Sequence, residues 1–110
     1  MTEATDAVLL RIYIKESDRH NGQPLHLAII EEARKQGLAG ATALRGISGF
    51  GSRKAKPSTK FSAEVAIVVE IIDWGDNVTP FVKKLDEMMD GGLITTEQVN
   101  VVWYQSKKST

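Results

Sequence analysis

The chain has 110 residues, of which 42 % are hydrophobic and 25 % charged; these values are typical of one globular domain and exclude a disordered tail, a collagen-like fibre and a coiled coil. The charges of its 14 basic and 14 acidic side chains cancel, which argues against a nucleic-acid partner. The absence of cysteine excludes disulfides, thiol catalysis and zinc–thiolate sites. No apolar run approaches the roughly 18–20 residues of a membrane span, and the acidic N-terminal stretch is unlike a signal peptide, so we expect a cytoplasmic protein.

The first half of the chain predicts a strand, a helix and a second strand. After a polar tail at residues 1–7, residues 8–14 place apolar side chains at alternate positions, which is typical of a strand. Pro24 suits the first turn of a helix because its missing N–H costs nothing there, and Gly37 is a suitable end for that helix. Residues 41–46 predict a weaker strand, because alanine is a poor strand former.

The second half predicts another strand and another helix. Residues 65–72 are the strongest strand candidate in the chain, and a turn is expected at residues 73–77. The pair Thr79-Pro80 resembles a helix start, with threonine as the N-cap and proline in the first turn. Residues 90–92, Asp-Gly-Gly, are expected to end this helix.

The C-terminal part predicts a short extended piece at residues 93–95, a last strand at residues 99–104 and a polar tail at residues 105–110. The resulting order is βαββαβ. Right-handed crossovers turn that order into an α+β, ferredoxin-like fold, with two helices on one face of a four-stranded antiparallel sheet. We therefore expect one domain over residues 8–104.

The predicted sheet is apolar on both faces. The third strand places Val65, Ile67, Val69 and Ile71 on one face and Ala66, Val68 and Ile72 on the other. Two helices cover only one face, and in a monomer the other face should be polar. We therefore expect a homo-oligomer in which the open faces pack together. The alternative is that the long loop or the tails fold over the sheet.

The segment at residues 47–64 has no clean period and follows a strand. Residues 45–63 contain five basic and no acidic side chains, namely Arg45, Arg53, Lys54, Lys56 and Lys60. Loops of this length are usually functional or disordered, and the charge suits an anionic ligand or an acidic partner surface. The alternative is a solvated loop that lysine keeps soluble. The glycines at its start allow a close backbone approach to phosphate, but they equally make a tight turn.

The polar segment after the first strand carries Glu16, Asp18 and His20 at alternate positions. In an extended loop these side chains could converge on a divalent metal. A carboxylate with a neighbouring histidine could also perform acid–base chemistry in a small hydrolase. The alternative is that Asp18 caps a turn, and the pair Asn21-Gly22 does mark a turn.

Three stretches of this chain resemble one family. They are L-R-I-Y-I-x-E-S-D-R-H-x-G-x-P-L at residues 10–25, G-L-A-G-A-T-x-L-R-G-I-x-G-F-G at residues 37–51, and L-D-E-M at residues 85–88 followed by G-L-I-T at residues 92–95. Together they are similar to the PII-like family known as domain of unknown function 190. The resemblance covers roughly residues 8–104.

The resemblance implies a ferredoxin-like trimer that binds adenine nucleotides or a similar small anion in clefts between subunits. In such proteins a long T-loop, matching residues 47–64, reaches toward a partner such as a membrane transporter or channel, and a B-loop matches residues 90–95. The implied ligand-binding residues are Arg45, Gly46, Ile47, Ser48, Gly49, Gly91, Gly92, Leu93 and Thr95. The implied partner-binding residues are Phe50, Arg53, Lys54, Lys56 and Lys60.

The resemblance also implies a signalling protein and not an enzyme. This chain departs from typical PII proteins, because residues 93–95 lack the B-loop lysine and residues 100–104 lack the arginines that hold the phosphates of ATP. Arg45 is therefore the best single candidate for contact with the anion, and AMP, ADP, ATP and cyclic nucleotides all stay open. An alternative on the same fold is a divalent-metal tolerance module that uses Glu16, Asp18 and His20.

Overall fold

The computed structural model describes residues 4–49 and 65–105 of the chain. These residues contain six strands and two helices. In chain order these elements are β1 (Ala4–Lys15), β2 (Arg19–His20), β3 (Gln23–Pro24), α1 (Leu25–Lys35), β4 (Ala41–Arg45), β5 (Ala66–Trp74), α2 (Gly75–Met88) and β6 (Leu93–Val101). Within those ranges, neither helix has the length and apolar character needed to cross a membrane.

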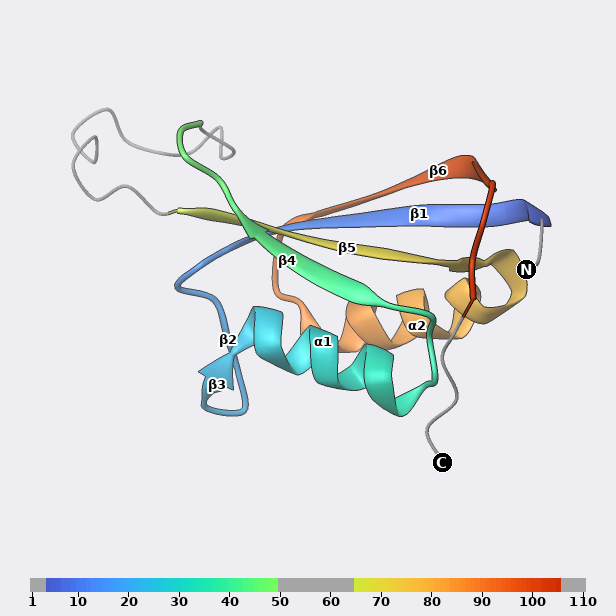
Figure 1. The fold of residues 1–110 in the computed structure, drawn as a ribbon. Coiled ribbons are helices and arrows are strands. Elements are labelled where there is room, and N and C mark those ends of the chain that lie inside the picture. Colours follow the sequence, from blue (N-terminus) through green and yellow to red (C-terminus); the bar gives the residue numbers. More distant parts are fainter. Residues whose placement is uncertain (1–3, 50–64, 106–110) are drawn as a thin grey trace.

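The main sheet contains four antiparallel strands in the spatial order β4-β5-β1-β6. Both helices lie on one side of it (Figure 1). This arrangement confirms the predicted ferredoxin-like fold. The short strands β2 and β3 form a separate hairpin, whose Asn21-Gly22 turn has φ angles of 49° and 81°. Positive φ at both positions is what a two-residue type I′ turn requires, so the predicted turn is confirmed.

The hydrophobic core lies between the sheet and the helices. Leu10 and Ile12 of β1, Ile29 of α1, and Phe81 and Leu85 of α2 are completely buried there. The cross-strand register places alternate apolar residues of β5 on the same face. The apolar residues predicted at alternate positions of the central strands β1 and β5 therefore point into the core.

The end of α1 follows the prediction. Gly37 has φ 75°, its N–H donates to the Arg34 carbonyl at 3.0 Å, and the Leu38 N–H donates to the Ala33 carbonyl at 3.0 Å. These two bonds form a Schellman motif, which needs a residue with positive φ and so favours glycine.

The start of α2 differs from the prediction. The helix begins at Gly75, so the turn expected at residues 73–77 and the start expected at the Thr-Pro pair are wrong. The Asp73 carboxylate accepts a hydrogen bond from the next backbone N–H at 2.6 Å and another from the Asn77 amide at 2.8 Å. These bonds satisfy polar groups at the helix start, and Pro80 is left inside the helix with its ring exposed.

The last strand also differs from the prediction. β6 is one strand from Leu93 to Val101, so the two pieces expected at residues 93–95 and 99–104 are wrong in their bounds. β1 explains the difference, because it begins at Ala4, inside the predicted tail, and pairs with β6 along most of its length. A long partner strand supplies hydrogen bonds even where the side chains of β6 are polar.

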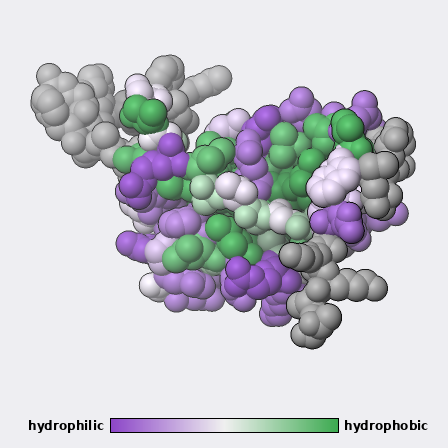
Figure 2. Space-filling view, viewed as in Figure 1, coloured by the Kyte–Doolittle hydropathy of each residue, from purple (hydrophilic) through white to green (hydrophobic). Residues whose placement is uncertain are grey.

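The face of the sheet away from the helices is largely apolar. Its exposed large side chains are Tyr13 at 37 %, Leu44 at 47 %, Ile72 at 38 % and Leu93 at 56 %, and Figure 2 shows hydrophobic side chains gathered over the strands. Near its centre, Arg11 Nη1 lies 2.9 Å from Glu97 and Arg11 Nε lies 3.2 Å from Glu70. Hydrogen bonds to Glu97 and Glu70 raise the pKa of Arg11. The predicted open apolar face is present, and the homo-oligomer stays a prediction.

Candidate functional site

The base of the long loop is a short polar segment at the end of β4. Arg45 ends the strand, and the Gly46 N–H donates to the Ala66 carbonyl of β5 at 2.8 Å. Ile47, Ser48 and Gly49 follow with exposed side chains or backbone. The backbone of the loop base is thus held by the sheet as far as Gly46, and the next residues leave it.

Glu16 holds the Arg45 side chain at the loop base. Glu16 follows β1, and its N–H donates to the Val65 carbonyl at 2.8 Å, which places the carboxylate beside the last residue of β4. The Arg45 guanidinium forms an ion pair with this carboxylate. Arg45 remains 69 % exposed while Glu16 is 39 % exposed. Arg45 can therefore meet an anion from solvent, but such an anion competes with Glu16.

The second implied segment, residues 90–95, joins α2 to β6. Gly92 has φ 125°, and a Cβ there would lie 2.7 Å from the Tyr13 carbonyl oxygen and 2.9 Å from Met89 Cε. Leu93 and Thr95 then pair with Tyr13 and Arg11 of β1. Only glycine fits the backbone angle and the close approach at position 92, so this turn packs tightly against β1.

The two implied ligand-binding segments lie at the same end of the sheet but on opposite edges. Arg45 lies on edge strand β4 and Leu93 on edge strand β6, with β5 and β1 between them. At the usual strand spacing of ~4.8 Å, the two edges are about 14 Å apart. One chain therefore does not bring its two segments together around a small anion, whereas two chains side by side can do so.

The structure does not bring Glu16, Asp18 and His20 together. Asp18 Oδ2 accepts a hydrogen bond from the Lys15 N–H at 2.9 Å, and His20 Nε2 lies 3.3 Å from the Asn21 amide, while Glu16 pairs with an arginine. Within residues 4–49 and 65–105, no three His, Asp or Glu side chains are placed to hold a metal ion. The alternate spacing suggested a common metal, but the turn directs each side chain to a different partner.

The matching family model is DUF190, described as an uncharacterized family, and it covers residues 7–101. The chain belongs to the DUF190 family. The UPF0166 protein of Aquifex aeolicus is 35 % identical over 98 residues, which cover 86 % of this chain and 92 % of the relative. A UPF0166 protein of Methanocaldococcus jannaschii is 30 % identical over 98 residues, which cover 86 % and 91 % respectively.

Two solved structures are similar to this DUF190 protein. A PII-like signaling protein of Thermus thermophilus matches with a TM-score of 0.62 and 22 % identity over 87 % of this chain and 89 % of its own. CPII of Thiomonas intermedia, solved with ADP and bicarbonate, matches with a TM-score of 0.56 and 14 % identity over 89 % and 93 %. At these identities the likeness shows a PII-like fold.

The implied partner-binding residues of the DUF190 protein lie outside the described part of the chain. They are Phe50, Arg53, Lys54, Lys56 and Lys60. The described structure ends at Gly49 on one side of the loop and resumes at Val65 on the other. Glu16 contacts both sides of the loop base, through the ion pair with Arg45 and the hydrogen bond to the Val65 carbonyl.

Sequence reasoning missed a cavity at the opposite end of the sheet. It lies where residues 102–105 turn back from β6 and where Trp74, Trp103 and Tyr104 come together. About 30 positions separate the first of these aromatic residues from the other two. No local motif joins them. The one sequence feature that could have indicated this cavity is that aromatic residues occur near the ends of two predicted strands.

Proposed function

We propose that this protein is a PII-like regulatory protein that binds an adenine nucleotide or a similar small anion between subunits, without catalysing a reaction. The separation of the two implied ligand-binding segments onto opposite sheet edges is the observation that carries this proposal. The two segments lie too far apart in one chain to enclose a small anion together, and a cleft between two chains would unite the edge of β4 with the edge of β6. The ADP and bicarbonate bound to CPII make these ligands the first to test.

The open sheet face supports the oligomer that this proposal needs. Burying exposed apolar side chains such as Tyr13 and Leu44 against another copy removes them from water, at roughly 25 cal/mol per Å². Glu70 and Glu97 both form ion pairs with Arg11, so each carboxylate keeps a partner on burial, although the three side chains together carry one net negative charge. We propose a trimer, which predicts a mass in light scattering of three times the 12.1 kDa of one chain.

The ion pair at the loop base suggests how a ligand acts on the loop. An anion that binds Arg45 replaces Glu16 as the partner of the guanidinium, so the liganded and free proteins differ at the point where the loop leaves β4. A ligand shifts the loop only as far as it binds one arrangement more tightly than the other. We propose that the basic T-loop then changes its affinity for a partner, a membrane transporter or channel.

Isothermal titration calorimetry with ATP, ADP, AMP, cyclic AMP and cyclic di-AMP, each with and without bicarbonate, tests the proposal. We expect saturable binding near one site per chain. Arg45→Ala should weaken that binding at least tenfold, since charge-assisted hydrogen bonds are roughly twice as strong as neutral ones.

Arg34→Ala is the matched control for this titration. It removes the same charge from an exposed position on α1, where Arg34 pairs with Glu31, and binding should not change. Absence of heat with every ligand contradicts the proposed function. Equal binding by the Arg45 and Arg34 variants contradicts the role given to Arg45.

A further inference from the structure

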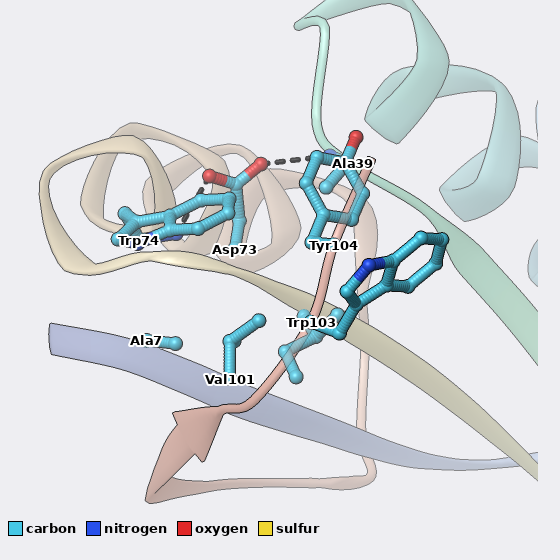
Figure 3. Close-up of a pocket in the computed structure, with 8 residues that line it drawn as sticks. Ala7, Ala39, Asp73, Trp74, Val101, Trp103 and Tyr104 are labelled. Atoms are coloured by element: carbon cyan, nitrogen blue, oxygen red, sulfur yellow. Dashed lines mark hydrogen bonds between the residues drawn. The ribbon is translucent and has the colours of Figure 1, made fainter. Parts of the chain in front are cut away.

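The cavity at the other end of the sheet is a second candidate site, apart from the proposed nucleotide cleft, and it shares Ile72 with the open sheet face. It has a volume of about 130 Å³ and lies beside the start of β1 and the ends of β5 and β6 (Figure 3). Its aromatic walls are Trp74, Trp103 and Tyr104, and its aliphatic lining includes Ala7, Ile72 and Val101. We call it the aromatic cavity.

A ring contact and a buried carboxylate hold the aromatic cavity in place. Tyr104 meets Trp74 edge to face, with ring centroids 5.7 Å apart and planes at 67°. Asp73 is 3 % exposed and also lines the cavity. Its carboxylate accepts three hydrogen bonds, from the Ala39 N–H at 2.7 Å and from two groups at the start of α2. The ring contact therefore packs Tyr104 against the end of β5, while the Asp73 bonds fix the neighbouring start of α2 and the Ala39 backbone.

The charges around the aromatic cavity favour a cation. Asp73 contributes a carboxylate, and none of the described residues that line the cavity is basic. Tryptophan and tyrosine rings attract a cation within about 6 Å of their faces, most strongly where water is excluded. A positively charged guest therefore gains from the rings, and Asp73 is the one acidic residue among the described residues that line the cavity.

The hydrogen bonds of Asp73 decide which kind of cation fits. A primary ammonium carries three N–H donors, and the carboxylate oxygens already accept three bonds from the protein. An alkylated ammonium has few or no donors to satisfy, and its methyl groups suit an apolar wall. A cavity of ~150 Å³ accommodates benzene, and a trimethylammonium head has a similar number of heavy atoms. We propose that the aromatic cavity binds a small alkylated ammonium group.

The test uses the chain's own fluorescence. The protein has two tryptophans, and both line the aromatic cavity, so its tryptophan emission reports on this one place. Choline is titrated against 3,3-dimethylbutan-1-ol, which has the same shape with carbon in place of the charged nitrogen. We expect a saturable emission change with choline and an affinity roughly tenfold or more above that of the alcohol, the difference due to the charge. Equal affinity for the two compounds, or no saturable change with choline, overturns the proposal.

Two substitutions of an exposed wall residue sharpen this test. Trp103 is 63 % exposed, so its replacement leaves the core intact. Trp103→Leu should lower choline affinity at least fivefold while Trp103→Phe retains most of it, with Trp74 as the remaining reporter. Val102→Ala, at an adjacent residue that is 81 % exposed and does not line the cavity, is the control and should bind normally. If Trp103→Leu binds choline as well as the control does, the proposal fails.

An experiment with lipid vesicles shows whether the alkylated ammonium group belongs to a lipid headgroup or to a soluble compound. Vesicles of phosphatidylcholine present the same trimethylammonium head as free choline. Co-sedimentation that choline competes away assigns a lipid headgroup, and binding of free choline without co-sedimentation assigns a soluble compound. Because the aromatic cavity and the proposed cleft lie at opposite ends of the sheet, nucleotide titration of the Trp103 variants separates a failure here from a failure of the proposed function.

Discussion

Replacing Gly92 by alanine tests whether the turn before β6 is as tightly determined as its geometry indicates. A non-glycine residue at φ 125° costs about 1–3 kcal/mol in backbone strain. The new Cβ would also lie 2.7 Å from the Tyr13 carbonyl oxygen and 2.9 Å from Met89 Cε. The methionine can move aside, but the carbonyl belongs to central strand β1. The overlap therefore adds roughly 1–3 kcal/mol, so the free energy of unfolding falls by roughly 2–6 kcal/mol.

Thermal unfolding followed by circular dichroism measures this loss. For a domain of this length, each kcal/mol lowers Tm by about 4 °C, so Gly92→Ala should melt roughly 8–24 °C below the parent protein. The matched control is Gly91→Ala, because a Cβ at position 91 would have no atom within 4 Å and the residue has no positive φ. All samples need one protein concentration, since assembly shifts Tm. Equal melting of the two variants would refute the reasoning.

Three further predictions concern the core, the start of α2 and the loop base. Phe81→Ala removes a completely buried ring and should cost about 3–5 kcal/mol in urea unfolding; a loss below ~1 kcal/mol contradicts its place in the core. Asp73→Asn keeps the shape but removes the charge that three hydrogen bonds share, at a cost of roughly 2–3 kcal/mol; unchanged stability contradicts that role. Glu16→Gln weakens the hold on Arg45 and should raise ADP affinity roughly two- to fivefold. Glu31→Gln, in an exposed ion pair on α1, is its control in the same calorimetric titration, and equal affinities would exclude competition by Glu16.

Local patterns in the sequence determined the fold class. Alternating apolar residues in β1 and β5 indicate two half-buried strands, Gly37 indicates the end of α1, and the Asn21-Gly22 pair indicates a tight turn. Each of these signals depends on a period or on a backbone angle within a few residues. Such short-range sterics act almost independently of the rest of the molecule, so the βαββαβ order and the open apolar face follow from the sequence.

Contacts between distant parts of the chain decided the element boundaries that the sequence did not. The Asp73 carboxylate binds the Ala39 N–H, 34 positions away, as well as two groups at the start of α2, and the helix begins at Gly75 and not at the Thr-Pro pair. Likewise, β1 holds the polar middle of β6 in the sheet through its backbone ladder. Hydrogen bonds to a partner far along the chain leave no local pattern, because the partner can have almost any side chain.

The candidate sites depended on tertiary structure most of all. The sequence by itself identified Arg45, a residue at the base of a basic loop, but only the fold showed that Glu16 occupies its guanidinium and that residues 91–95 lie on the far edge of the sheet. It also gave Asp18 and His20, whose spacing had suggested a metal, different hydrogen-bond partners, and it brought Trp74 beside Tyr104. Spacing along a chain determines which residues share a strand face. Which edges and ends of a sheet meet is set by strand order, because that order places residues side by side regardless of their distance in sequence.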